Sequence, residues 1–319
     1  MYDRFFGLGK GPFNLTPDPE CVFLTPQHRE ALVGITYAIL RRKGFVVLTG
    51  EAGTGKTTLL ARALQTMPPS RLQFGVILNP TLNTAEFLEM ALLDFGISDI
   101  PTSKARRLWK LQNLLLEGQQ QGKISALIVD EAHKLGPDVL EEIRLLGNFE
   151  AADHKLLQIL LVGQTELEDN LERQDLRQLK QRIALWLRLS PLGSTEVGEY
   201  IRYRWAAAGG KEPPFSTEAI DCVALASRNI PRVINNLCET ALTLALGEGN
   251  AEVKGRHVLA AADEMKIGIK RDVTEPTPAP SVDPEVVAEA PLEQYHNGRP
   301  TGWAKWAERL RLSARHETA

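Results

Sequence analysis

Residues 50–57 have the sequence Gly50-Glu51-Ala52-Gly53-Thr54-Gly55-Lys56-Thr57, which matches the pattern G-x-x-x-x-G-K-[ST] at every fixed position. The apolar, β-branched run at 45–49 predicts a buried strand before this stretch, and the run at 58–64 predicts a helix after it. A glycine-rich loop between a strand and a helix is the context in which this pattern binds phosphate. The sequence therefore predicts a phosphate-binding loop, although glycine-rich turns before helices also occur without that function.

Each residue type in this loop suits the chemistry of a bound nucleotide. The glycines let successive backbone N–H groups point at phosphate oxygens, and the helix N-terminus adds a partial positive charge. Lys56 is expected to reach the β- and γ-phosphates, and the Thr57 hydroxyl is expected to bind Mg²⁺. The expected nucleotide is ATP, and the residues assigned to binding it are Gly50, Glu51, Ala52, Gly53, Thr54, Gly55, Lys56, Thr57 and Thr58.

A pair of acids ends a later apolar run. The run at 126–130 predicts a strand whose last residue is Asp130, and Glu131 follows it. In a phosphate-loop protein, an acid at the tip of a neighbouring strand lies near the nucleotide, so Asp130 is expected to hold Mg²⁺ through its water shell. Glu131 would then orient or deprotonate the water that attacks the γ-phosphate. The alternative is a solvated turn that merely closes a strand, and the four apolar residues before the pair favour the site.

The pattern of the first 190 residues predicts the fold class. Short apolar runs alternate with helical periodicity, and the predicted strands are 45–49, 74–78, 126–130, 156–162 and 184–189. Such alternation is typical of a parallel sheet covered by helices on both faces. The prediction is an α/β P-loop NTPase fold, with a three-layer αβα core around a parallel five-stranded sheet. A small all-helical domain follows it, with helices at 194–208, 217–227 and 231–246 and a fourth from about 256.

Four segments are expected along the chain. Residues 1–190 form the nucleotide-binding α/β domain with an N-terminal segment on the adenine side, and 191–270 form the helical domain. Residues 271–300 are a linker, because their proline-rich, acidic composition cannot form a core. Residues 301–319 are an amphipathic tail in which Trp303, Trp306 and Leu310 share a helical face beside basic residues. Such a tail docks on a membrane interface or in a partner's groove, or it folds back on its own domain.

Composition narrows the class of protein. Hydrophobic residues make up 43% and charged residues 24%, as in ordinary soluble globular proteins. The net charge of −3 gives no overall basic field for nucleic acid, which leaves only a local basic patch for DNA. Three widely spaced cysteines indicate neither a disulfide framework nor a zinc cluster. No signal sequence or membrane span is evident, so a cytoplasmic location is expected, with peripheral attachment to the inner membrane left open.

The phosphate loop, the Asp130-Glu131 pair and the helical second domain resemble the AAA+ ATPases of the ORC1/DEAH type. Shorter stretches resemble the ExeA-like branch of that group (general secretion pathway protein A). These stretches are Phe5-Phe6-Gly7-Leu8, Pro12-Phe13-Asn14-Leu15-Thr16-Pro17-Asp18-Pro19, His28-Arg29-Glu30-Ala31-Leu32, Arg42-Lys43-Gly44-Phe45, Val162-Gly163-Gln164, Gln181-Arg182-Ile183 and Ile230-Pro231-Arg232. The resemblance covers about residues 1–268.

The resemblance implies Mg²⁺-dependent ATP hydrolysis in a homo-oligomer, with a helical lid over the nucleotide. Gln164 matches the sensor-1 position, and Arg232 matches the sensor-2 arginine of the lid. Arg182 matches the arginine finger that a subunit gives to its neighbour's ATP; it lies in an arginine-rich helical stretch, so Arg173 and Arg177 are alternatives. The expected catalytic residues are thus Glu131, Lys56, Arg182, Gln164 and Arg232. Pro12-Phe13 and His28 are candidates for the adenine pocket, and Gln164 could instead be an ordinary loop amide.

The sequence departs from the family pattern at two points. Asn229 stands where glycine is expected before Ile230-Pro231-Arg232, and asparagine also tolerates a left-handed backbone. The secretion ATPases of the branch carry a membrane helix and a peptidoglycan-binding domain after the ATPase, and this sequence has neither, which weakens the expectation of a secretion role.

Three biological roles therefore remain open. One is an assembly or secretion motor at the cell envelope. Another is a DNA-associated ATPase of the transposition or replication-initiator-helper type, suggested by the basic stretch Lys104-Arg106-Arg107-Lys110. The third is a nucleotide-gated scaffold that binds a protein partner through the tail. A P-loop kinase fits less well, because the acid pair and a helical second domain suit hydrolysis better than transfer to an acceptor.

Overall fold

A computed structural model describes residues 2–16, 18–19, 21–78, 81–151 and 154–268 of the chain. The predicted linker at 271–300 and the predicted tail at 301–319 lie outside the described residues. Within the described part, no helix is both long enough and apolar enough to cross a membrane.

The core is a parallel five-stranded sheet, as predicted. Its strands are β1 (Phe45–Gly50), β2 (Leu72–Ile77), β3 (Ile124–Val129), β4 (Leu157–Gly163) and β5 (Ile183–Leu189). Their order across the sheet is β2-β3-β4-β1-β5, and every pairing is parallel. All residues of β1, β3 and β4 are buried, and apart from Thr49, Ser125 and Gln158 they carry no polar side chain, because strands covered on both faces have no polar side.

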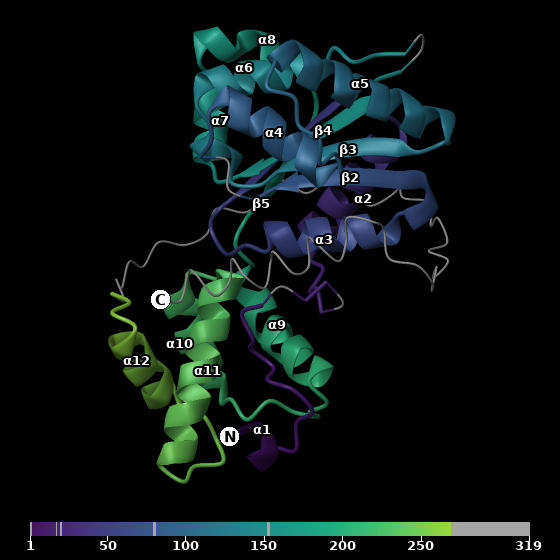
Figure 1. Cartoon of the computed structure of the whole chain (residues 1–319). Helices are drawn as coiled ribbons and strands as arrows, with labels where there is room; N and C mark the ends of the chain where they lie inside the picture. The colour runs from purple at the N-terminus through teal and green to yellow at the C-terminus, as the bar shows by residue number, and fades with distance from the viewer. Residues whose placement is uncertain (1, 17, 20, 79–80, 152–153, 269–319) are drawn as a thin grey trace, which may run out of the picture.

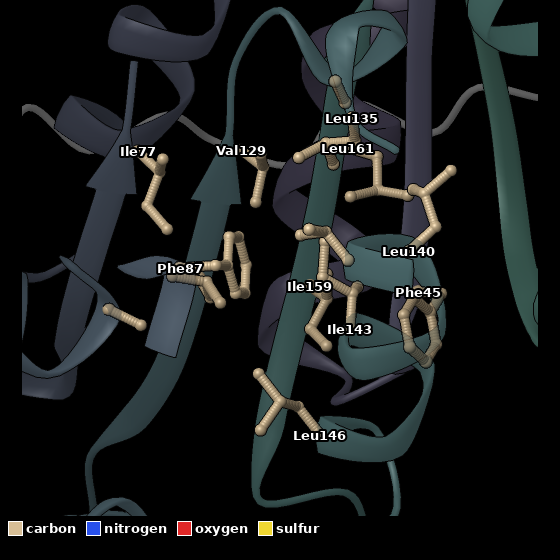
Figure 2. Close-up of a cluster of buried hydrophobic side chains, with 14 of the residues drawn as sticks. Phe45, Ile77, Phe87, Val129, Leu135, Leu140, Ile143, Leu146, Ile159 and Leu161 are labelled. Carbon is tan, nitrogen blue, oxygen red and sulfur yellow. The ribbon is translucent and has the colours of Figure 1, made fainter. Parts of the chain in front are cut away.

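Helices cover both faces of the sheet (Figure 1). On one face lie α2 (Pro26–Leu40) and α3 (Lys56–Thr66), whose Ile35 and Leu60 pack against Val46 of β1. The other face is covered by α4 (Thr84–Asp94), α5 (Lys104–Gln120), α6 (Pro137–Leu146), α7 (Glu166–Leu171) and α8 (Arg177–Lys180). Figure 2 shows this second layer, where Phe87 and Ile143 belong to the same buried cluster as Leu161 of β4. The result is the predicted three-layer arrangement.

Local sequence signals set several helix boundaries. Thr25 caps α2, its hydroxyl accepting a hydrogen bond from the backbone N–H of His28, and Pro26 takes the first helical position. Asn83 and Glu86 form a reciprocal capping box at the start of α4. The helices α6 and α7 were not predicted, whereas α8 falls within the arginine-rich helical stretch that was expected. Three short 3₁₀ helices also connect the main elements: η1 (Pro69–Arg71), η2 (Ala132–Lys134) and η3 (Gln174–Leu176).

A helical bundle follows the sheet and lies below it in Figure 1. It consists of α9 (Ser194–Ala207), α10 (Thr217–Ser227), α11 (Pro231–Gly247) and α12 (Gly255–Glu264), which match the four predicted helices. Arg228 and Asn229 are left-handed, with φ of 50° and 61°, between α10 and α11. The expectation that Asn229 permits such a break is therefore confirmed.

The N-terminal segment packs with this bundle before it reaches the sheet. It begins with the short helix α1 (Tyr2–Phe5), and Tyr2, Leu8 and Phe13 are buried in the same apolar cluster as the bundle helices. The Tyr2 hydroxyl donates to Glu239 Oε2 at 2.5 Å. Arg204 of α9 donates from Nε to the carbonyl of Pro12 at 2.7 Å. The described residues before α2, namely 2–16, 18–19 and 21–25, are here called the strap, and they lead from the bundle to the start of α2.

Candidate functional site

A cavity of about 430 Å³ lies at the carboxyl edge of the sheet, between the phosphate loop, the strap and the bundle. Most of the predicted site residues line it: Ala52, Gly53, Thr54, Gly55, Lys56, Thr57, Thr58, Asp130, Glu131, Gln164 and Arg232. Gly50 and Glu51 begin the loop but do not line the cavity, and Arg182 lies at the opposite edge of the sheet. The residues predicted to act on one nucleotide within a single subunit are thus brought together around one cavity.

Backbone geometry explains why glycine occupies two positions of the loop. Gly53 and Gly55 have φ of 84° and 95°, in the left-handed region that favours glycine. A Cβ atom on Gly53 would lie 2.7 Å from Cβ of Arg232. The backbone N–H of Arg232 also donates to the Gly53 carbonyl at 3.2 Å. The start of α11 therefore contacts the phosphate loop directly, and this contact requires the absence of a side chain at Gly53.

Substitution of Gly53 by alanine is expected to lower the free energy of unfolding by about 1–3 kcal/mol, because it adds a strained backbone conformation and a clash with α11. The matched control is Gly247→Ala, since Gly247 ends α11 without a left-handed φ and has nothing within 4 Å of an added Cβ. That control should raise stability by up to about 1 kcal/mol. Urea denaturation of both variants checks the prediction, and equal effects would contradict it.

Lys56 is held inside the loop by backbone carbonyls. Its ammonium donates to the carbonyl of Gly50 at 2.8 Å and to that of Glu51 at 2.9 Å, and the residue is 7% exposed. Burial lowers the pKa of Lys56, while the nearby Asp130 and Glu131 carboxylates oppose that shift. An ammonium in this position can exchange its carbonyl partners for phosphate oxygens, which are stronger acceptors because they are charged.

Thr57 and Asp130 form the candidate magnesium site. The Thr57 hydroxyl donates to Asp130 Oδ2 at 3.0 Å, and the backbone N–H of Glu131 donates to Asp130 Oδ1 at 2.9 Å. Burial raises the pKa of the Asp130 carboxyl, and these two hydrogen bonds oppose the shift. Mg²⁺ prefers hard oxygen ligands and usually keeps several waters, with only one or two protein carboxylates. A hydroxyl and one carboxylate beside an open cavity fit that requirement.

Glu131 is aimed into the cavity by an unusual backbone. Its φ is 54°, which is left-handed and costly for a glutamate. Its carboxylate lies 3.1 Å from the ammonium of Lys134 and 3.6 Å from Nε2 of His133. The side chain is 34% exposed, so water can reach it. A carboxylate within reach of water beside the phosphate loop has the placement that a general base needs.

His133 connects Glu131 to Gln164, a link that the sequence did not predict. The backbone N–H of Gln164 donates to Nδ1 of His133 at 3.3 Å, and the amide of Asn170 donates to the His133 carbonyl at 3.0 Å. The end of β4 is thereby tied to the turn after β3. The only sequence signal was a histidine two residues after the acid pair, which by itself has many structural explanations.

The opposite side of the cavity is built by the strap and the bundle. Arg204 holds the strap carbonyls of Pro12 and Asn14, and the Tyr200 hydroxyl donates to Asn235 Oδ1 at 2.9 Å. Tyr200, Arg204 and Asn235 all line the cavity. None of them was predicted, because the strap and α9 are far apart in sequence. Phe13 is buried against Phe215 and does not appear in the cavity lining, whereas His28 does.

His28 joins α2 to the phosphate loop. Its Nε2 lies 3.3 Å from the Thr54 carbonyl, which can only accept, so Nε2 carries the proton. Its Nδ1 lies 2.7 Å from the Thr25 hydroxyl, which then donates to it. The side chain is buried, and burial lowers the pKa of His28. The histidine is therefore neutral in the folded protein at neutral pH.

The free energy of unfolding is expected to fall as the pH is lowered through about 6.5, the ordinary pKa of histidine. The unfolded chain then binds a proton at His28 that the folded chain does not, so stability is complete above that pH and is lost below it. Urea denaturation between pH 5 and pH 8 measures this change. His28→Gln should flatten the profile, and an unchanged slope in that variant would contradict the prediction. His133→Gln serves as the matched histidine control.

Arg182 lies at the other edge of the sheet from the cavity. It directly precedes β5, whose first residue Ile183 pairs with Phe45 at the start of β1. Its guanidinium donates to Asn148 Oδ1 at 2.6 Å and to the Arg144 carbonyl at 3.1 Å. The expected arginine-rich helix is broken: Arg173 precedes η3 and pairs with Asp175, and only Arg177 lies in α8. None of the three arginines lines the cavity of its own subunit.

The basic stretch at the start of α5 is mostly engaged within the subunit. Lys104 pairs with Glu142 at 2.6 Å, Arg107 with Glu89 at 3.1 Å, and Lys110 with Asp99 at 2.6 Å. Three of the four cations that suggested DNA binding are therefore paired with acids of the same subunit.

Comparison with known proteins gives one family and one curated relative. Residues 39–171 match the family model described as AAA domain. Over 275 residues the chain is 38% identical to the General secretion pathway protein A of Aeromonas hydrophila. That alignment covers 86% of this chain and 50% of the relative, so the chain spans about half the length of the curated relative it matches.

Solved structures share the fold at low sequence identity. The ORC2 protein of Aeropyrum pernix has a TM-score of 0.62 and 16% identity, covering 80% of this chain and 71% of that chain. Cdc6p from Pyrobaculum aerophilum has a TM-score of 0.61 and 18% identity, covering 81% and 72%. The ORC1 protein of Aeropyrum pernix, in complex with DNA, has a TM-score of 0.56 and 18% identity, covering 80% and 69%. These likenesses show the arrangement of strands and helices.

Proposed function

Because this chain has an AAA domain and the AAA+ P-loop NTPase fold, we propose that it binds ATP with Mg²⁺ and hydrolyses the bond to the γ-phosphate. One observation carries the proposal. Lys56, the Thr57–Asp130 pair and Glu131 all line one cavity, with the Thr57 hydroxyl 3.0 Å from the Asp130 carboxylate. These are the charge donor, the metal ligands and the base that the reaction needs.

Each residue of the site has a proposed task. Thr57 and Asp130 hold Mg²⁺, which neutralises charge on the phosphates when it is bound. Lys56 exchanges the carbonyls of Gly50 and Glu51 for the β- and γ-phosphates. Glu131 accepts the proton of the attacking water, and Gln164 orients the same water. His133 holds Glu131 and Gln164 in position relative to each other. Arg232 carries charge from the bundle to the phosphates, so the bundle acts as a lid domain at 191–270 beside the 1–190 domain.

ATP with Mg²⁺ is expected to raise the melting temperature of the protein, and the protein should release inorganic phosphate in a Mg²⁺-dependent reaction. Thr57→Ala should weaken this stabilisation by ATP and Mg²⁺, because it removes a ligand of the ion. Thr66→Ala is the matched control: Thr66 ends the same helix, is exposed and does not line the cavity. The proposal fails if wild-type protein shows neither ATP-dependent stabilisation nor phosphate release.

The catalytic unit is proposed to be a homo-oligomer. Arg182 lies at the amino edge of the sheet, whereas the cavity lies at the carboxyl edge, so Arg182 can serve only the ATP of another subunit. Specific activity should therefore rise with protein concentration. A rate per subunit that stays constant on dilution would remove the oligomer from the proposal.

The proposed biological role is to couple ATP hydrolysis to assembly or secretion at the cell envelope, from the cytoplasmic side. The 38% identity to the General secretion pathway protein A supports this role, and the match covers half of that protein. A DNA-associated ATPase is the second candidate, supported by the fold shared with the ORC1 protein solved in complex with DNA. A nucleotide-gated scaffold that binds a protein partner through residues 301–319 is the third.

One assay separates these roles. ATP hydrolysis is measured in buffer, with duplex DNA and with anionic lipid vesicles in parallel. Stimulation by DNA that disappears at moderate salt would favour the second role, because phosphate contacts weaken steeply with salt. Stimulation by vesicles would favour the first. A partner captured by the full chain but not by a chain lacking residues 301–319, without either stimulation, would favour the third.

A further inference from the structure

Basic side chains collect at the amino edge of the sheet, on the opposite side from the cavity. Arg71 ends η1 directly before β2, and Lys123 directly precedes β3. The first residues of these two strands, Leu72 and Ile124, pair with each other, so Arg71 and Lys123 are neighbours.

The turn before β1 joins this group. Arg41 and Lys43 lie in the turn between α2 and β1, on either side of Arg42, whose guanidinium donates to the Lys123 carbonyl at 3.1 Å. The four cations Arg41, Lys43, Arg71 and Lys123 are named here the basic rim. They come from three separate turns that the parallel sheet brings to one edge.

The charges of the basic rim are not neutralised within the described part of the chain. None of the four side chains forms an ion pair with an acid there, in contrast to Lys155 on the same edge, which pairs with Glu150. Arg41, Lys43 and Arg71 are exposed, and the Lys43 ammonium lies 5.7 Å from the centre of the Tyr37 ring. The rim therefore presents uncompensated positive charge to solvent beside an aromatic ring.

An apolar stripe on α2 leads to the basic rim. Val33, Tyr37 and Leu40 are 65%, 50% and 40% exposed, and their spacing places them along one side of the helix. The opposite side of α2 packs on the sheet through buried residues such as Ile35 and Ile39. The stripe ends where the turn carrying Arg41 and Lys43 begins. Glu30, an exposed acid one turn before Val33, marks the other end of the stripe.

We propose that the basic rim and the α2 stripe together dock the protein on an anionic lipid bilayer. Aliphatic and aromatic side chains beside lysines and arginines are the combination that inserts at a membrane interface, where apolar groups enter the acyl boundary and cations meet lipid phosphates. Nucleic acid would explain the rim but would leave Val33 and Leu40 exposed. A symmetric contact with a second copy would bring two basic rims together, which like charges oppose. A head-to-tail contact, such as the one proposed through Arg182, is separated from lipid docking by the oligomeric state of the stripe variant.

This docking goes beyond ATP hydrolysis and does not depend on it. The rim and the cavity lie at opposite edges of the sheet, so the docking surface does not cover the subunit's own cavity. It is also separate from the predicted tail at 301–319, which lies outside the described residues.

Co-sedimentation of the full chain with vesicles tests the proposal. One set of vesicles contains phosphatidylglycerol with phosphatidylcholine, and the other contains phosphatidylcholine alone. The rim variant carries Arg41→Gln, Lys43→Gln, Arg71→Gln and Lys123→Gln, and the stripe variant carries Val33→Ser, Tyr37→Ser and Leu40→Ser. The matched control is Arg106→Gln with Trp109→Ser, an exposed cation and an exposed aromatic on α5.

Melting temperatures show whether each variant folds. If the rim variant does not fold, it is replaced by two double variants, Arg41→Gln/Lys43→Gln and Arg71→Gln/Lys123→Gln.

Wild-type protein and the control should bind anionic vesicles but not neutral ones, and added salt should release the bound protein from the vesicles. The rim variant should bind at least about 100-fold more weakly, given the attraction of each cation to an anionic surface.

Equal binding by wild type and both variants, or binding lost only when residues 301–319 are deleted, would overturn the proposal. So would duplex DNA binding that depends on the rim without vesicle binding, or a change of oligomeric state in the stripe variant. Basal ATP hydrolysis without lipid should stay unchanged in the folded variants, so failure of docking is distinguishable from failure of the ATPase proposal.

Discussion

Replacement of Glu131 by glutamine is expected to abolish ATP hydrolysis while ATP binding is retained. Glutamine keeps the shape of the side chain but cannot accept the proton of the attacking water. General-base catalysis contributes about 10²–10⁴-fold to a rate, so turnover should fall by at least that range. Binding should persist because the proposed contacts of Lys56, Thr57 and Asp130 with the phosphates and the metal do not involve Glu131. Single-turnover phosphate release and ATP-dependent thermal stabilisation measure the two properties separately.

The control for this variant is Glu166→Gln. Glu166 is an exposed carboxylate whose field also acts on Lys56, but it does not line the cavity. The control changes the local charge by the same amount and should leave hydrolysis nearly unchanged. Hydrolysis that survives in Glu131→Gln would show that the base is another residue. If both variants lost hydrolysis, the cause would instead be the change in the electric field that these carboxylates exert on Lys56.

Replacement of Arg182 by alanine is expected to lower ATP hydrolysis by about 10³–10⁵-fold, the range that an arginine supplied by a neighbouring molecule contributes in related phosphoryl transfer. The cavity of the variant should stay intact, because the hydrogen bonds of Arg182 with the described residues go to Asn148 and Arg144 at the far edge of the sheet. A mixture of Arg182→Ala and Glu131→Gln subunits should recover part of the activity. In mixed assemblies, one interface combines an intact Glu131 with an intact Arg182.

Arg173→Ala and Arg177→Ala are the matched controls. Arg173 is paired with Asp175, whereas the exposed Arg177 forms no side-chain hydrogen bond or ion pair with the described residues. If Arg177→Ala loses the activity and Arg182→Ala keeps it, the finger is Arg177. Arg182→Lys tests the structural role of Arg182, since lysine can still reach Asn148 but cannot present a planar guanidinium. Absence of recovery in the mixture would contradict donation between subunits.

The sequence was sufficient for the parts of the site that are local in the chain. The phosphate loop is defined within eight residues, and its flanking strand and helix were predicted from adjacent apolar runs. The tip of β3 was also predicted, because an apolar run that ends in Asp130 and Glu131 is itself a local pattern. These signals sufficed because a strand buried on both faces has a nearly continuous apolar sequence, and the glycines of the loop lie within the same short stretch.

The remaining parts of the site depend on contacts between distant segments. Arg204 reaches the strap carbonyl of Pro12, and His133 reaches the backbone of Gln164, yet no periodicity connects either pair. The short helix α7 was missed because it has too few turns for an amphipathic pattern to emerge. The basic stretch at α5 illustrates the converse. Its charges suggested a DNA surface, and only the fold revealed that Glu142, Glu89 and Asp99 neutralise three of them.

The strap has a mechanical consequence for the lid. It is fastened to α11 through Tyr2 and Glu239 and to α9 through Arg204, and it continues into α2, where His28 contacts the phosphate loop at Thr54. Residues of the strap form one wall of the cavity. Because the strap is attached to the bundle at one end and to α2 at the other, it must move when the bundle moves relative to the sheet. Any rotation of the helical bundle relative to the sheet must therefore change the shape of the cavity. The volume available to a nucleotide then depends on the angle between the bundle and the sheet.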